Sequence, residues 1–160
     1  KDYVKQSSLF DIQRRTFVAL RVRSKPRHDI KDVKYLLKRA KVQKKLFGDT
    51  AYDAEFLHEY CWNNNIKVNI PLREFKQTWK NYGLKPHYTG ERKKANFLFN
   101  PQTYKFRSLI ESVNSAIKRT LGSWVCSRKP ENQQKQTTIK AIAYNIEQIN
   151  RTIKIQIFIN

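Results

Sequence analysis

The sequence predicts an α/β protein in which helices pack on a sheet, and three observations support this prediction. Residues 3–24 contain two runs rich in β-branched and aromatic residues around a polar turn, which is typical of a β-hairpin. Residues 30–40 repeat apolar side chains with a helical period. The order strand, strand, helix, strand, helix, strand then requires parallel crossovers, which place helices against a sheet.

The elements up to residue 71 have local causes in the sequence. Asp29 precedes the first apolar-periodic segment, so we expect it to cap that helix, and Asp53 is expected to cap the second helix in the same way. Trp62 lies on the apolar face of the second helix and is expected in the core. The expected elements are a short buried strand at 45–48 ending in a glycine turn, a helix at 54–65 and a strand at 66–71.

The last third of the chain predicts two helices and a terminal strand. Pro101 is expected to open a helix of about twenty residues, because proline is well suited to a first helical turn. A connection and a helix at 137–150 follow. Residues 151–160 alternate in polarity like an edge strand. We therefore expect one domain over residues 1–150 and a tail at 151–160.

The composition indicates a folded protein with a polyanionic partner. The chain has 160 residues, of which 39% are hydrophobic, enough to form a core. It has 33 Lys and Arg residues against 13 Asp and Glu residues, a formal net charge of +20. Such an excess is larger than solubility requires and favours nucleic acid as the partner. No apolar run is long enough to cross a bilayer, so we expect a cytoplasmic, nucleoid-associated protein with no membrane partner.

Residues 73–99 mix basic and aromatic side chains without a clear period. This composition suits a surface that follows a phosphate backbone and stacks on exposed bases. The alternative is a long solvated loop whose aromatic side chains pack into the domain. If the first interpretation holds, the contacts with DNA include Trp79, Lys93 and Lys94.

One acidic residue, Glu111, stands among basic and phenolic side chains at helical spacing. On an α-helix with about 100° per residue, Tyr104, Glu111 and Lys118 fall two turns apart on nearly one line. Arg107 falls within about 60° of that line. The simple alternative is a surface salt bridge. The apolar residues of the same segment cluster on the opposite side, namely Phe106, Leu109, Ile110, Val113, Ile117 and Leu121.

This pattern resembles the YREK signature of DDE transposases from bacterial and archaeal insertion sequences. Tyr104, Arg107, Glu111 and Lys118 match the signature residue for residue. Independently, GDTAYDAEFL is similar to a family segment of the form (A/G)D-x-x-Y-D, in which the first Asp follows a buried strand. That Asp is Asp49 here.

The resemblance implies an RNase H-like mixed sheet flanked by helices, and a two-metal phosphoryl transfer that cleaves and joins DNA. Asp49 and Glu111 would be catalytic acids that bind Mg²⁺, a hard cation that prefers oxygen ligands. Tyr104, Arg107 and Lys118 would hold phosphates at the element end. The implied partners are the terminal inverted repeats of the element and a second copy of the protein in a homodimer.

The family fold also implies a first strand that carries the first catalytic Asp. Because the hairpin at 3–24 fits the second and third strands, we expect that first strand to lie before Lys1 and the natural protein to start upstream. Asp11 is assigned to the hairpin turn rather than to the metal site. We therefore expect that the chain as given does not transpose DNA. If it nicked the terminal repeats in the presence of Mg²⁺, and Glu111→Gln abolished the nicking, this expectation would be contradicted.

Two other functions fit the charge: a catalytically inactive DNA-binding remnant of a transposase, and a basic RNA-binding protein.

Overall fold

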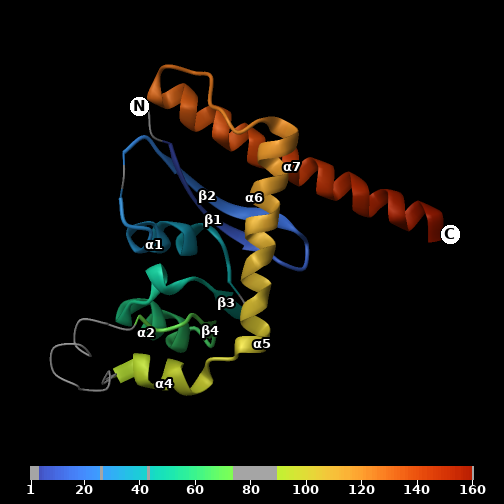
Figure 1. Cartoon of the computed structure of the whole chain (residues 1–160). Coiled ribbons are helices and arrows are strands. Elements are labelled where there is room, and N and C mark those ends of the chain that lie inside the picture. The colour runs from blue at the N-terminus through green and yellow to red at the C-terminus, as the bar shows by residue number, and fades with distance from the viewer. Residues whose placement is uncertain (1–3, 26, 43, 74–89, 160) are drawn as a thin grey trace. The chain divides into compact units, whose positions relative to one another are not determined.

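The computed structural model of the chain describes residues 4–25, 27–42, 44–73 and 90–159 (Figure 1). These residues form helices and two two-stranded sheets, one of β1 and β2 and one of β3 and β4, so the predicted α/β class is confirmed. They divide into two compact units. Unit 1 consists of Lys1–Ala40 with Ser108–Asn160, and unit 2 is Lys41–Arg107. No helix in the described part of the chain is long and apolar enough to span a membrane.

Unit 1 begins with the predicted hairpin. Strands β1 (Lys5–Asp11) and β2 (Thr16–Arg23) pair antiparallel. Asp11 closes the turn, because its Oδ1 accepts hydrogen bonds from the backbone N–H groups of Gln13 at 2.9 Å and Arg14 at 3.1 Å. The assignment of Asp11 to the hairpin turn is confirmed.

Helix α1 (Ile30–Arg39) lies on one side of the hairpin and buries Leu36 against Ala19 of β2. The predicted helix is confirmed, but the predicted cap is wrong. Asp29 occupies the position before the helix without a capping hydrogen bond from its side chain, because its carboxylate forms an ion pair with Lys5 instead.

Helices α6 (Ser108–Leu121) and α7 (Pro130–Ile159) complete unit 1 on the other side of the hairpin. Phe17 of β2 is buried with Ala141 and Tyr144 of α7, and apolar side chains of α6 pack against this cluster. Asn145 fixes the strand to the helix. Its side-chain amide donates to the backbone carbonyl of Phe17 and accepts from the N–H of Phe17, both at 2.8 Å, as a neighbouring strand would.

The prediction of a terminal strand is wrong. Residues 151–159 continue α7 instead of alternating as a strand. Because the residues before them already form a helix, each further residue adds a backbone hydrogen bond without a new nucleation cost. The alternating apolar pattern of residues 151–160 gave no indication that a helix directly precedes them.

Unit 2 contains the predicted parallel crossover. Strands β3 (Lys45–Phe47) and β4 (Lys67–Asn69) pair parallel, and α2 (Glu55–Asn63) connects them. Helix α4 (Gly90–Leu98) occupies part of the segment predicted to lack periodicity. The buried apolar residues of the unit include Leu46, Leu57, Cys61, Ile66, Ile70 and Ala95.

The long helix predicted from Pro101 is interrupted. The structure has a short helix α5 (Pro101–Tyr104), a 3₁₀ turn η2 (Lys105–Arg107) and then α6. The interruption falls where the packing partners change. Phe106 lies against Phe47 of unit 2, with ring centroids 6.2 Å apart, whereas Ile110 packs into the core of unit 1. Tertiary contacts therefore override the continuous helical pattern.

Candidate functional site

Asp49 lies at the end of a buried strand, as predicted. Leu46 of β3 is buried, and Asp49 follows after Gly48 with its side chain partly exposed. Its Oδ1 accepts a hydrogen bond of 2.9 Å from the N–H of Ala51 and caps the 3₁₀ helix η1 (Thr50–Tyr52). A Cβ at Gly48 would lie 3.3 Å from side-chain atoms of Ile70 and Tyr52, so a larger residue there would require these side chains to shift by a few tenths of an ångström. The position of this carboxylate is thus fixed by packing and by its own cap.

Tyr104 and Arg107 lie together in unit 2. The Tyr104 ring lies 5.5 Å from the Phe99 ring between centroids, and the guanidinium carbon of Arg107 lies 5.7 Å from the Tyr104 centroid. Cation–π contact of this kind holds a phenol and a guanidinium next to each other. A hydroxyl and a set of N–H donors are the groups that hold a phosphate oxygen.

Asn69 positions the helix that carries Tyr104, and sequence reasoning missed it. This residue ends β4 and is buried. Its Nδ2 donates to the Asn100 carbonyl at 2.9 Å and to Thr103 Oγ1 at 3.0 Å, while its Oδ1 accepts from the Asn100 N–H at 2.9 Å. The signal was an asparagine between the apolar residues Val68 and Ile70, since a buried amide needs several partners.

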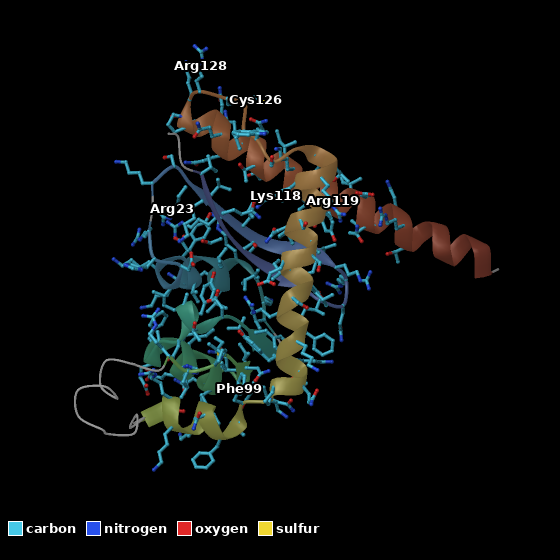
Figure 2. All side chains as sticks on the ribbon, viewed as in Figure 1. Arg23, Phe99, Lys118, Arg119, Cys126 and Arg128 are labelled. Carbon is cyan, nitrogen blue, oxygen red and sulfur yellow. The ribbon has the colours of Figure 1, made fainter. Side chains whose placement is uncertain are left out.

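Glu111 and Lys118 lie on α6 in unit 1, and both side chains are exposed. Their separation of seven residues places them about two turns apart on one side of the helix. Ile110, Val113 and Ile117 pack into the core on another side, as predicted. Figure 2 shows Lys118 projecting from the C-terminal part of α6.

The prediction of one continuous helical face for all four signature residues is wrong. Tyr104 and Arg107 precede or lie within the 3₁₀ turn η2, where the rotation per residue differs from that of an α-helix. The apolar stripe is also narrower than predicted. Phe106 is 49% exposed and Leu121 is 39% exposed.

Asp53 is the centre of a buried cluster rather than a helix cap. Ala54 occupies the cap position of α2. The carboxylate of Asp53 is fully buried and contacts His58 Nε2 at 3.0 Å, the N–H of Arg73 at 2.8 Å and the Nε of Arg92 at 3.1 Å. Burial alone would raise the pKa of Asp53, but the hydrogen bonds from His58, Arg92 and Arg73 and the charge of Arg92 outweigh it, and the pKa falls to about 2.

The predicted basic and aromatic surface is only partly within the described residues. Trp79 lies outside them. Lys93 of α4 is exposed. Lys94 lies 4.6 Å above the ring centroid of Trp62 and 2.7 Å from Glu91 Oε1, so its charge is shared with an acid and an aromatic face. Trp62 is 53% exposed, and the prediction of a core residue is wrong.

The two acids that the motifs predict as metal ligands lie in different units, Asp49 in unit 2 and Glu111 in unit 1. Asp49 and Glu111 carry carboxylates, the hard donors that Mg²⁺ prefers. Among the residues that the structure describes, no three His, Cys, Asp or Glu side chains gather in a way that could hold a metal ion.

A comparison with known families decides the class of the protein. The family described as "Transposase DDE domain" matches residues 1–146. The chain belongs to this family of DDE transposases. Neither a curated protein nor a solved structure matches the chain significantly. The DDE transposase family acts in DNA transposition by nuclease and strand-transfer chemistry and generally uses divalent cations, so DNA is the substrate class.

Proposed function

We propose that this DDE transposase belongs to the YREK group and acts at the ends of an insertion sequence, where it cleaves and joins DNA by two-metal phosphoryl transfer. The observation that carries this proposal is the family match over a region in which both motif acids, Asp49 and Glu111, keep accessible carboxylates. By contrast, Asp53 has a buried carboxylate that forms an ion pair with Arg92.

Asp49 and Glu111 are proposed as ligands of Mg²⁺. Bound divalent cations would activate the attacking oxygen and stabilise the leaving oxygen of the phosphodiester. The contribution of Asp49 is a carboxylate held by the Ala51 N–H at the end of β3. Glu111 contributes a carboxylate from the first turn of α6, where the helix dipole also favours a negative charge.

Tyr104, Arg107 and Lys118 are proposed to bind phosphates at the element end. Arg107 offers a planar fork of donors that matches phosphate oxygens, and Lys118 offers a mobile point charge. Asn69 supports this role indirectly, because it ties the start of α5 to the end of β4. The exposed Lys93 is proposed as an additional contact with the DNA backbone.

An RNase H-like arrangement is proposed for the fold. It is supported by the order of elements, an antiparallel hairpin followed by a helix and a parallel crossover through α2. Such folds place catalytic carboxylates at strand ends and on a later helix, which are the locations of Asp49 and Glu111.

Manganese binding tests the metal site. Mn²⁺ replaces Mg²⁺ at oxygen sites and is detected directly by electron paramagnetic resonance. We expect Asp49→Asn and Glu111→Gln each to weaken Mn²⁺ binding by about tenfold, because each removes one hard ligand. Asn at position 49 still accepts the bond from Ala51, so the fold should be retained.

Glu59→Gln and Glu131→Gln are the matched controls for this experiment. Both residues are exposed and lose the same charge without touching the candidate residues. Equal Mn²⁺ affinity in all four variants would contradict the proposal. If neutralising Asp49 and Glu111 instead only strengthened binding to polyanions, a basic RNA-binding protein or an inactive DNA-binding remnant would explain the chain better.

A homodimer is proposed in the DNA complex, and α7 supports it. Four isoleucines on this helix are between 52% and 62% exposed, and they recur at intervals of three, four and three residues. This is the spacing of a coiled-coil seam. The inner face of the same helix is already occupied by Ala141 and Tyr144. The isoleucines are Ile139, Ile142, Ile146 and Ile149.

Sedimentation velocity tests the homodimer. We expect Ile142→Asp with Ile149→Asp to convert the dimer to a monomer, because two buried charges in the seam would lose hydration. Asn150→Asp introduces a similar charge at an exposed neighbouring position and should leave the dimer intact. A wild-type chain that stays monomeric with DNA present would refute this part of the proposal.

A further inference from the structure

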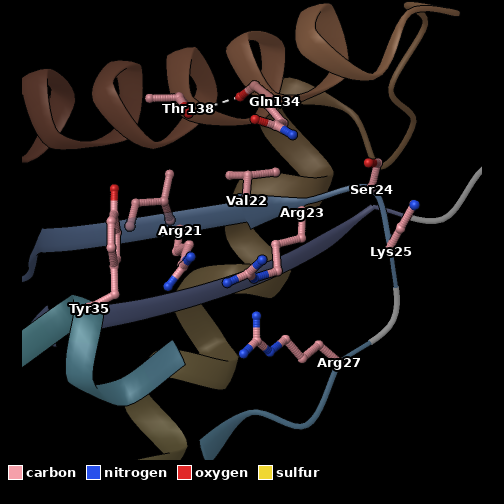
Figure 3. Close-up of a pocket in the computed structure, with 10 residues that line it drawn as sticks. Arg21, Val22, Arg23, Ser24, Lys25, Arg27, Tyr35, Gln134 and Thr138 are labelled. Atoms are coloured by element: carbon pink, nitrogen blue, oxygen red, sulfur yellow. Dashed lines mark hydrogen bonds between the residues drawn. The ribbon is translucent and has the colours of Figure 1, made fainter. Parts of the chain in front are cut away.

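An arginine-lined cavity at the end of β2 lies apart from every candidate residue of the transposase motifs. Its volume is about 700 Å³. All of its lining residues belong to unit 1 and come from β2, the loop after it, α1 and α7. Its walls include Arg21, Arg23, Lys25, Arg27 and Tyr35 (Figure 3).

Three guanidinium groups gather in this cavity. Arg21 and Arg23 alternate along β2, so both side chains leave the same face of the strand. Figure 3 shows the guanidinium groups of Arg21, Arg23 and Arg27 close together on the side of β2 that faces α1. Gln134 and Thr138 of α7 lie on the other side of the strand.

One buried carboxylate holds two of these arginines. Asp32 of α1 is fully buried, and its Oδ1 lies 2.8 Å from Arg23 Nε and 3.5 Å from Arg21 Nε. Its Oδ2 accepts a hydrogen bond of 3.0 Å from Ser7 Oγ. Both ion pairs involve the Nε atoms, so Asp32 orients the arginines without consuming their terminal N–H groups.

One of the remaining guanidinium donors lacks an acceptor. Arg23 Nη2 is buried and has no hydrogen-bond partner among the described residues. An unsatisfied buried donor destabilises the fold, and a charged one does so more strongly. The guanidinium carbon of Arg21 lies 4.2 Å from the centroid of the Tyr35 ring, and this cation–π contact helps to hold the group in the cavity. A phosphate oxygen would supply the missing acceptor to a fork that is already oriented.

The charge balance also favours an anion with more than one oxygen. Arg21, Arg23, Lys25 and Arg27 line the cavity, and Asp32 forms ion pairs with Arg21 and Arg23. The other nearby acid, Asp29, is paired with Lys5. The like charges repel one another unless a ligand neutralises them.

We infer that this cavity is a second phosphate-binding site, in which Arg21, Arg23 and Arg27 hold the backbone of a nucleic-acid strand outside the transposase motifs. The inference rests on the proposed function in that DNA is the ligand. The cavity is open to solvent, so a phosphate group of a continuous strand has access to it. Bases are not read here, because backbone contacts position a duplex without specifying its sequence.

The salt dependence of DNA binding tests the site. The probe is a short fluorescein-labelled duplex of mixed sequence, titrated with the full chain at several salt concentrations. Arg27→Gln should weaken binding and lower the slope of log K against log salt by about 0.9, the value for one lost phosphate contact. Arg27 is exposed, and its side chain makes no hydrogen bond or ion pair with the described residues, so the variant should fold.

Two further variants sharpen the test. Arg27→Lys should keep the slope but bind more weakly, because lysine keeps the charge and loses the bidentate fork. Arg14→Gln is the matched control: Arg14 is an exposed arginine of unit 1 in the hairpin turn, outside the cavity, and its replacement should leave the slope nearly unchanged.

Three other outcomes would contradict the second phosphate-binding site, its nucleic-acid ligand or the proposed function. If the wild type binds DNA and Arg27→Gln leaves the slope unchanged, the second site is wrong while the proposed function stands. If the wild type binds no DNA, both are wrong. If inorganic phosphate, at ionic strength matched with chloride, raises the Tm of the wild type more than that of Arg27→Gln while the DNA slope is unchanged, the site binds free phosphate and the nucleic-acid ligand is wrong.

Discussion

Asp32 in unit 1 and Asp53 in unit 2 both have buried carboxylates, but the two carboxylates have different numbers of positively charged partners. Asp53 meets one arginine, one histidine and one backbone N–H. Asp32 meets two arginines and one serine hydroxyl. Taking Arg27 of the same cavity into account, the cations around Asp32 outnumber the acid, whereas the charge around Asp53 is close to balanced.

The difference shows that a buried carboxylate with ion pairs has two roles in this chain: it joins elements of the fold in one unit and orients arginines in the other. Around Asp53 the ion pairs join α2, the segment after β4, and α4, so the cluster closes a fold. Around Asp32 they orient arginines whose terminal groups face a cavity, so the cluster presents charge. The two proposed metal ligands differ from both of these buried acids, because Asp49 is partly exposed and Glu111 is exposed.

The largest expected effect on stability comes from replacing each of the two acids by asparagine. Removing one partner of a buried ion pair costs about 3–5 kcal/mol, and we expect Asp53→Asn to lose about this much in the free energy of unfolding. Asp32→Asn should cost less, about 2 kcal/mol, because Arg21 keeps its cation–π contact with the Tyr35 ring when the carboxylate is lost. Urea unfolding of both variants measures the order of the two losses.

The two cysteines tell which unit is affected. Cys61 is buried in unit 2, where burial raises its pKa to about 11, whereas Cys126 of unit 1 is exposed. On a Cys126→Ser background, Asp53→Asn should accelerate the labelling of Cys61 by a thiol reagent and Asp32→Asn should not. Equal acceleration by both variants would show that the two clusters do not stabilise separate units.

A smaller effect is expected from acid. The pKa of Asp53 is about 2 in the folded chain against an ordinary value of 3.8. Because the pKa of Asp53 is lower in the folded than in the unfolded chain, the ionised carboxylate stabilises the fold. This contribution is fully present above pH 3.8 and is lost as the pH falls through about 2. The expected loss is about 2 kcal/mol in the free energy of unfolding. Asp53→Asn should lack this part of the pH dependence, and a variant with the same acid loss as the wild type would contradict the assignment.

Several features of the fold were predictable because their causes are local. The hairpin, α1 and α2 follow from short-range periodicity, and the turn at Asp11 from a side chain that bonds its own backbone two and three residues on. The location of Asp49 after a buried strand followed from its motif. Glu111 and Lys118 share one side of α6 because a single regular helix carries both.

Other features depended on partners far away in the sequence. Asp53 contacts Arg92, which is 39 residues away, and Asn69 contacts Asn100 at a separation of 31 residues. The division of the predicted helix before α6 has the same origin, since Phe106 and Ile110 pack against different cores. No local pattern contains such information.

By itself, the sequence determined the α/β class, the basic character and the membership of the DDE transposase family. Periodicity and charge are properties of short segments, so they can be recognised without the tertiary structure. The tertiary structure decided which acids are buried, where the helix before α6 breaks and how Arg21, Arg23 and Arg27 come together. Burial and convergence are set by long-range packing, and the free energy of an ion pair or of an unpaired guanidinium depends on that packing.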